Sequence, residues 1–138
     1  MKINKLIILL ISIILICIGA VLITYYTQII KHVDYKDMDV KVGMVVGINI
    51  DTDAMHFGIV RPRGIARHKL NITNIFDYNS QIIISWKGNI SHMISVSDNN
   101  FALEPGEIRV VTFSCTIPEN APINATYEGR ARVMFKKI

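Results

Sequence analysis

The first hydrophobic stretch of the chain is continuous, without the alternation that marks a strand. From Leu6 to Tyr26 no residue is charged, and Ser12 and Thr24 are the only clearly polar side chains. A helix of this length is roughly 30 Å long, which matches the hydrocarbon thickness of a bilayer. Each of the two hydroxyls can bond to a carbonyl of its own helix. The sequence therefore predicts a transmembrane helix over residues 6–26 after a short N-terminal segment at 1–5.

The flanking residues predict which way this helix crosses the membrane. Lys2 and Lys5 precede the apolar run, whereas the lysines that follow it lie among three aspartates. Tyr25 and Tyr26 stand where an aromatic belt is expected. By the positive-inside rule, residues 1–5 stay in the cytoplasm and the C-terminal part lies outside the cell membrane.

The alternative for this segment is a cleaved signal peptide. Apolar regions of signal peptides usually run about 7–15 residues and end in small residues at positions −3 and −1 of the cleavage site. Here the run is longer, and the best small pair, Gly19-Ala20, places Ile18 at −3. An uncleaved anchor is the favoured interpretation.

Beyond a predicted stalk at residues 27–37, the hydrophobic pattern changes to alternation. Polar residues and glycines occupy one set of alternating positions, namely Asp39, Lys41, Gly43, Gly47 and Asn49. Apolar residues occupy the other set, namely Val40, Val42, Met44, Val46, Ile48 and Ile50. Alternation with period two predicts a half-buried strand from Met38 to Ile50. The triplet Asp51-Thr52-Asp53 then predicts a turn.

Shorter strands separated by turn residues are predicted along the rest of the chain. Their ranges are Met55–Val60, Ala66–Thr73, Gln81–Lys87, His92–Ser97, Glu107–Ile117 and Thr126–Lys136. Three inward-facing sets follow from their parity: Ile82, Ile84 and Trp86; Val111, Phe113, Cys115 and Ile117; Tyr127, Gly129, Ala131, Val133 and Phe135. About seven strands without a long helical period predict an all-β, immunoglobulin-like sandwich over residues 38–138.

Several motifs in this region resemble immunoglobulin-like domains of the major-sperm-protein and Hydin-like type. They are Phe57-Gly58-Ile59-Val60 with the Gly64 turn, the strand end Ile72-Thr73-Asn74, the F-x-L-x-P-G-E stretch Phe101–Glu107, and Ile117-Pro118, Ala121-Pro122 and Tyr127-Glu128-Gly129. Asn124 or Ala125 takes the place of the glycine usual before that tyrosine. The resemblance implies an adhesive, spacer or assembly module without shared catalytic residues, and the isoleucine-rich composition is similar to that of small archaeal envelope proteins.

Composition narrows the class of protein further. The chain has 138 residues, 51% of them hydrophobic, and a mean hydropathy of +0.36. One small domain remains once the apolar segment is set aside, which excludes a multidomain enzyme, a disordered polymer and a disulfide scaffold. Cys115 is the only cysteine after the apolar segment, and its inward parity predicts a buried, unpaired thiol.

A local cluster of basic residues is the first candidate for a binding surface. It consists of Arg61, Arg63, Arg67, His68 and Lys69. Without Lys2 and Lys5 the balance is 13 basic minus 11 acidic residues, or +2, which does not favour a nucleic-acid partner. The cluster is interpreted as a solvated turn and edge strand, or as a contact for anionic lipid headgroups or an acidic envelope glycoprotein. In a simple meander, the Arg61–Gly64 turn would return toward the bilayer.

Three N-x-S/T triplets predict acceptor sites for N-glycosylation. They begin at Asn71, Asn89 and Asn124. Asn89 and Asn124 fall in predicted loops, and Asn71 lies on the outward parity of a strand. Their use depends on the compartment in which the domain is located.

No motif in the sequence predicts catalysis, a metal ion or a cofactor. His32, His56, His68 and His92 are scattered without metal-ligand spacing, and no nucleophile elbow or phosphate-binding loop is present. We therefore expect a membrane-anchored, extracytoplasmic structural or interaction module of the cell envelope, bound to the bilayer by its helix and to an envelope protein or glycan. The alternatives are an accessory subunit of a surface filament or secretion machine, and an extracytoplasmic hydrolase.

Overall fold

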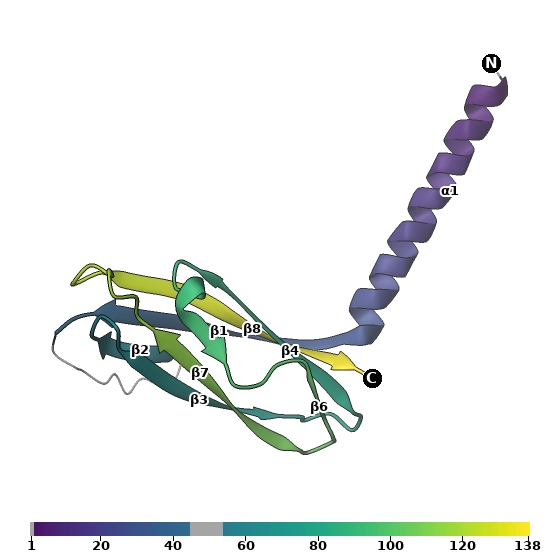
Figure 1. Cartoon of the computed structure of the whole chain (residues 1–138). Coiled ribbons are helices and arrows are strands. Elements are labelled where there is room, and N and C mark those ends of the chain that lie inside the picture. The colour runs from purple at the N-terminus through teal and green to yellow at the C-terminus, as the bar shows by residue number, and fades with distance from the viewer. Residues whose placement is uncertain (1, 45–53) are drawn as a thin grey trace.

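A long N-terminal helix leads the chain. The computed structural model describes residues 2–44 and 54–138 (Figure 1). Helix α1 spans Lys2–Thr24 and continues as the π-helical turn η1, Tyr25–Ile29. The apolar stretch Asn4–Ile29 has a mean hydropathy of 3.5 over its most apolar window, and none of that window is buried. This helix is long and apolar enough to be a membrane span or a signal sequence.

Two hydroxyls inside the helix bond to its own backbone, as the sequence predicts. Ser12 Oγ donates to the Leu9 carbonyl at 2.7 Å, and Thr24 Oγ1 donates to the Ala20 carbonyl at 2.9 Å. These bonds remove the cost of placing a hydroxyl in an apolar surrounding.

The helix runs directly into the first strand. Strand β1 covers Ile30–Val42 and pairs antiparallel with β8, Thr126–Lys137, from Ile30 opposite Lys136 to Lys41 opposite Thr126. Residues 30–37, predicted as a stalk, are therefore part of the sheet. The side chains of this segment that face inward are the polar His32, Asp34 and Lys36, which line a pocket beside Phe135. The segment therefore lacks the apolar–polar alternation that predicts a strand.

The predicted strand over 38–50 is confirmed for Met38–Val42. Met38, Val40 and Val42 are fully buried as predicted, but the strand ends at Val42 and Met44 is 64% exposed. Val46, Ile48, Ile50 and the turn predicted at residues 51–53 lie outside the described residues.

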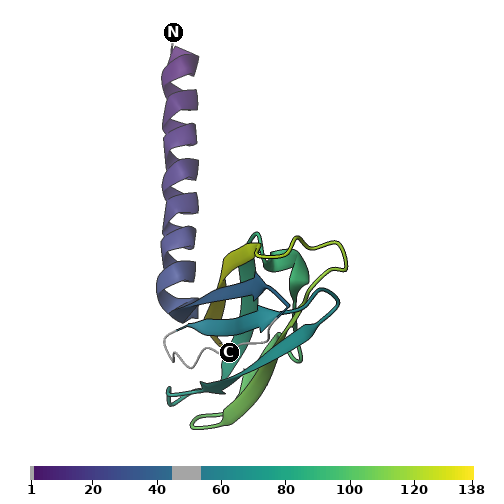
Figure 2. The ribbon, with the colours of Figure 1, turned by 90° about the vertical axis from the view of Figure 1, so that its left-hand side faces the viewer.

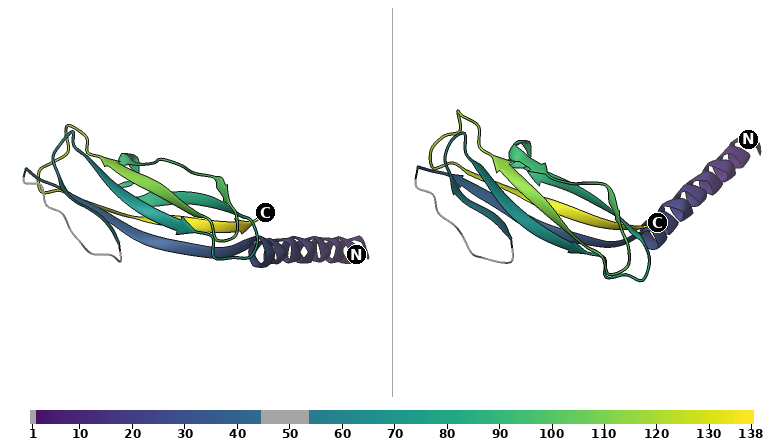
Figure 3. Two further views of the ribbon diagram at one scale, coloured as in Figure 1. Left: turned by 90° about the horizontal axis from the view of Figure 1, so that it is seen from below. Right: turned by 60° about the horizontal axis from the view of Figure 1, so that its bottom comes forward.

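Within the described residues, eight strands form two sheets, which confirms the prediction of a mostly β structure. The five-stranded sheet has the order β2-β1-β8-β4-β6, and the three-stranded sheet has the order β3-β7-β5. The remaining bounds are β2 Met55–Val60, β3 Ile65–Thr73, β4 Ser80–Gly88, β5 Ile94–Val96, β6 Phe101–Leu103 and β7 Ile108–Thr116. Figure 2 and Figure 3 show the two layers facing each other, with α1 extending from one end.

The core lies between these sheets. The predicted inward sets of β4, β7 and β8 all contribute to it, with Trp86, Tyr127 and Gly129 only half buried. The range predicted as a strand at His92–Ser97 divides into the 3-10 turn Ser91–Met93 and the short strand β5. Trp86 lies on an interior strand and donates from Nε1 to the Ser91 carbonyl at 3.2 Å.

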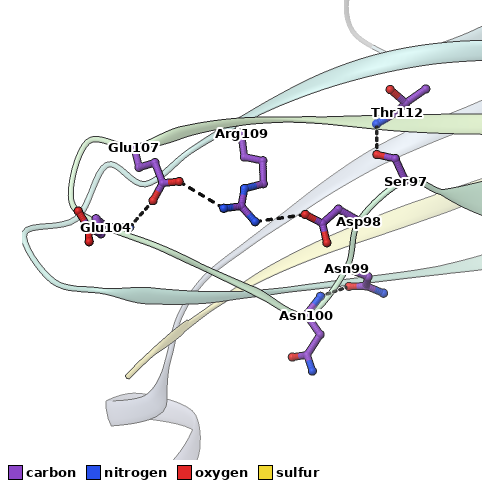
Figure 4. A network of polar contacts seen from close by, with 8 residues as sticks. All are labelled: Ser97, Asp98, Asn99, Asn100, Glu104, Glu107, Arg109 and Thr112. Atoms are coloured by element: carbon purple, nitrogen blue, oxygen red, sulfur yellow. Dashed lines mark hydrogen bonds and ion pairs between the residues drawn. The ribbon is translucent and has the colours of Figure 1, made fainter.

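The F-x-L-x-P-G-E stretch forms β6 and a tight turn into β7. The Glu107 amide donates to the Glu104 carbonyl at 3.0 Å, and Gly106 has a φ of +77°, as expected for a Pro-Gly turn. Figure 4 shows Glu107 accepting from the Glu104 amide while Arg109 lies between Glu107 and Asp98. These contacts fix the turn at the end of the sandwich where α1 joins β1.

Cys115 is fully buried and unpaired, as its parity predicts. Burial raises the pKa of its thiol to about 11, so at pH 8 only about one thiol in a thousand is the reactive thiolate. In a Cys17→Ser chain we expect iodoacetamide to modify Cys115 only after unfolding. Mass spectrometry with and without denaturant measures this, and rapid labelling of the native chain would contradict the burial.

Candidate functional site

Charged side chains of β1, β2, β4 and β8 gather on the outer surface of the five-stranded sheet. Successive side chains of a strand point to opposite faces. Because Met38 and Val40 of β1 and Ala131 and Val133 of β8 are in the core, the residues between them point outward. We call this surface the charged face, and it comprises Tyr35, Asp37, Asp39, His56, Ser85, Lys87, Glu128, Arg130 and Arg132.

Strand register arranges the charged face in rows across β1, β8 and β4. Arg132 on the central strand lies between Tyr35 of β1 and Ser85 of β4. In the next row Arg130 lies between Asp37 and Lys87. Glu128 lies opposite Asp39 in the third row. The face is thus basic toward Arg132 and acidic toward Glu128.

Two ion pairs link neighbouring strands on this face. Arg130 Nε donates to Asp37 Oδ1 at 2.6 Å, and this hydrogen bond raises the pKa of the Arg130 guanidinium above its usual value. His56 Nδ1 hydrogen-bonds to Asp39 Oδ1 across β2 and β1. Burial, followed by the nearby charge of His56, lowers the pKa of His68 on β3. The Arg130–Asp37 pair is mostly exposed and the His56–Asp39 pair is partly exposed, so solvent screens both pairs and they add little to the stability of the fold.

Two adjoining clefts open on the charged face. The larger has a volume of about 720 Å³ and is lined by both acidic and basic side chains: Asp37, Asp39, His56, Lys87, Glu128 and Arg130. The smaller has a volume of about 220 Å³ and is lined by Tyr35, Ser85, Trp86, Lys87, Arg130 and Arg132. Among the described residues, the buried Nε of Arg132 has no hydrogen-bond partner.

The chemistry available here is that of charged donors and acceptors. In the described residues no hydroxyl or thiol hydrogen-bonds to His56, and no three His, Cys, Asp or Glu side chains gather as metal ligands. Two other histidines lie away from this face: His32 packs near Phe76 and Phe135, and His92 against Tyr127. What the face offers is a surface that can bind a charged ligand.

The basic cluster predicted from the sequence lies elsewhere. Arg61 Nε donates to the Met44 carbonyl at 3.0 Å, and Arg63 pairs with Glu119. Arg67 and Lys69 are exposed at alternate positions of β3, which is an edge strand as interpreted from the sequence. Contact of Arg61, Arg63, Arg67 and Lys69 with an anionic partner stays a prediction.

The Arg61–Gly64 turn does not return toward the helix, because the strands do not form a simple meander. Strand β2 pairs parallel with β1, with Met55 opposite Met38 and Val60 opposite Val42. The turn after β2 therefore lies near the end of β1, away from the junction with α1 (Figure 1). That expectation from the sequence is wrong.

The three sequon asparagines are exposed, and their glycosylation stays a prediction. Asn71 lies on β3, Asn89 follows β4, and Asn124 precedes β8. The Asn89 Oδ1 accepts from the Glu128 amide at 2.6 Å. Asn124 has a φ of +67°, so it adopts the left-handed conformation that the usual glycine would supply.

The sequence interpretation missed the charged face. A signal was present in β8, where Glu128, Arg130 and Arg132 alternate with core residues. Its partners come from other strands whose register cannot be read from one sequence. No family model, curated protein or solved structure matches this chain.

Proposed function

We propose that this chain is a non-catalytic, single-pass protein of the cell membrane that holds an immunoglobulin-like sandwich at the outer surface, where it binds a component of the cell envelope. The observation that carries the proposal is the exposed apolar helix that passes through η1 into β1 without a linker. With α1 in the bilayer, this connection keeps the domain next to the membrane.

Contacts at the junction support this arrangement. The Lys136 ammonium lies 5.9 Å from the centre of the Tyr25 ring, and Lys31 Nζ donates to the Thr27 carbonyl at 3.0 Å. Tyr25 and Tyr26 meet edge to face. Tyrosines and lysines are the residues that favour the headgroup layer. The junction thus has the composition of a membrane boundary.

The charged face supports the binding part of the proposal. It lies on the sheet that contains β1, is exposed, and combines two clefts with unevenly distributed charge. Such a face suits an envelope protein or glycan that carries charge of its own.

Alkaline extraction of membranes tests the anchor. We expect the full chain to stay in the membrane pellet, and a C-terminal tag to be removed by protease added to intact cells. Replacing Ile14 and Leu15 by arginine costs about 2.5–3.5 kcal/mol of insertion per residue, so most of this variant should leave the membrane. The matched control, Ile14→Leu with Leu15→Ile, should behave like the original chain.

Other outcomes of the same experiment would overturn parts of the proposal. A mature protein whose mass shows loss of α1 would identify a signal peptide, and a tag protected from protease would contradict the outward orientation. Crosslinking of intact cells followed by tag purification then identifies the partner. Recovery of a filament or secretion motor would favour the accessory-subunit alternative over an envelope linker.

A further inference from the structure

We propose that the smaller cleft of the charged face binds a phosphate group, held by Arg132, Lys87 and the hydroxyl of Ser85. The inference deepens the proposed function by assigning a ligand class to this face. Binding itself can be measured on the purified chain, wherever the domain is located in the cell.

The first argument is the charge around the cleft. Lys87 lies directly opposite Arg130, and like charges at such positions in an antiparallel pair repel each other. Arg132 adds a third cation from the adjacent row. The carboxylate of Asp37, which lies opposite Arg130 on the neighbouring strand, is already hydrogen-bonded to Arg130. A bound anion would relieve this repulsion.

The second argument is an unused donor. The Nε of Arg132 is buried and has no hydrogen-bond partner among the described residues. A buried N–H without an acceptor is costly, and native proteins rarely retain one without a ligand, ion or water. Arg132 lines the smaller cleft, so an acceptor oxygen bound there would complete the hydrogen bonding of this guanidinium once the side chain turns its Nε toward the cleft.

The third argument concerns size and donor type. A volume of about 220 Å³ is below the roughly 300–1,000 Å³ of sites for drug-sized ligands, and suits a compact ionic group. Guanidinium groups present paired donors that match phosphate oxygens, and an ammonium adds a point charge. Ser85 and Tyr35 supply hydroxyl donors from the two flanking strands.

The neighbouring cleft provides an internal contrast. There Asp39 lies opposite Glu128, and both carboxylates repel an anion. Phosphate should therefore bind only at the Arg132 end of the face. Its source can be a soluble phosphate or a lipid headgroup, since Tyr35 is five residues along β1 from Ile30, or roughly 17 Å from the helix junction.

The arginine Nε–Hε signals of the full chain in nonionic detergent test the proposal directly. Inorganic phosphate is titrated at constant ionic strength, with chloride as the balancing anion. We expect a saturable shift of the Arg132 signal and no shift of Arg67, which is exposed on the other sheet. In the variants, binding is read from the signal of Arg130, which lines the same cleft. Arg132→Gln should weaken phosphate binding at least about tenfold, whereas the matched variant Arg67→Gln should leave it unchanged.

A second arm identifies the source of the phosphate group. The chain is placed in nanodiscs of phosphatidylcholine, with or without phosphatidylglycerol. A shift of Arg132 only with phosphatidylglycerol assigns the site to an anionic headgroup, and a shift only with added inorganic phosphate assigns it to a soluble ligand. If Arg132→Gln does not fold, Lys87→Gln replaces it, with a weakening of about fivefold or more expected.

Failure of this inference can be separated from failure of the proposed function. The phosphate site is overturned if the chain remains folded and the Arg132 Nε–Hε signal does not shift in either arm of the experiment. If that chain is still retained in the membrane pellet, the anchored module stands without this ligand. If phosphate binds but the chain is extracted at alkaline pH, the site stands and the anchor does not.

Discussion

Replacing Gly88 by alanine is expected to destabilise the sandwich by about 2–6 kcal/mol, from strain of about 1–3 kcal/mol and a steric clash of similar size. Gly88 has a φ of +116°, which residues with a Cβ rarely adopt. A Cβ placed there would lie 2.5 Å from the Glu128 carbonyl oxygen and 2.5 Å from Gly129 Cα, both backbone atoms. Urea unfolding of the full chain in nonionic detergent, followed by Trp86 fluorescence, measures the change.

Gly106 supplies the matched control. Its φ of +77° is also positive, but nothing lies within 4 Å of the position that a Cβ would take. Gly106→Ala should therefore cost only the conformational strain, about 1–2 kcal/mol. Equal effects of the two substitutions would show that β4 and β8 are not held as closely at Gly88 as the structure indicates.

Replacing Asn74 by alanine is expected to reduce stability by about 3 kcal/mol, since several buried polar groups lose a partner at once. Asn74 is fully buried. Its Nδ2 donates to the carbonyls of Tyr78 and Leu103 at 2.8 and 3.1 Å, and its Oδ1 accepts from the Phe76 amide and the Ser80 hydroxyl, both at 3.2 Å. The melting temperature should fall by about 10–20 °C.

The control for this substitution is Asn71→Ala on β3, the strand that ends just before Asn74. Asn71 is exposed, so its removal should change stability by less than about 0.5 kcal/mol. Asn74→Asp should be as harmful as Asn74→Ala, because a carboxylate would face two carbonyl oxygens. A neutral effect of both Asn74 substitutions would contradict the assigned hydrogen bonds.

Much of the β structure could be predicted because its strands alternate clearly. The range Met55–Val60 was predicted with the observed bounds, and the inward residues of β4, β7 and β8 face the core. The Asx turn at Asn74 could also be predicted from its place at a strand end. Its contact with Leu103, far along the chain, depends on packing and was not foreseen.

The parts that could not be predicted depend on pairing between distant segments. The parallel pairing of β1 with β2 reverses the expected position of the Arg61–Gly64 turn, and nothing local encodes it. Residues 30–37 form a strand because β8 extends to Lys137 beside them, although their own pattern is polar. The charged face was missed for the same reason, since Arg132 and Ser85 become neighbours only through register.

The direct passage from α1 into β1 has a mechanical consequence. A partner that pulls the far end of the sandwich away from the helix junction would load β1 along its length. Hydrogen bonds of an antiparallel pair are perpendicular to the strands. The ladder from Ile30–Lys136 to Lys41–Thr126 would then be strained in shear, with its bonds resisting together. With α1 as the proposed membrane anchor, the sheet itself would carry the tension between the membrane and a partner bound to the domain.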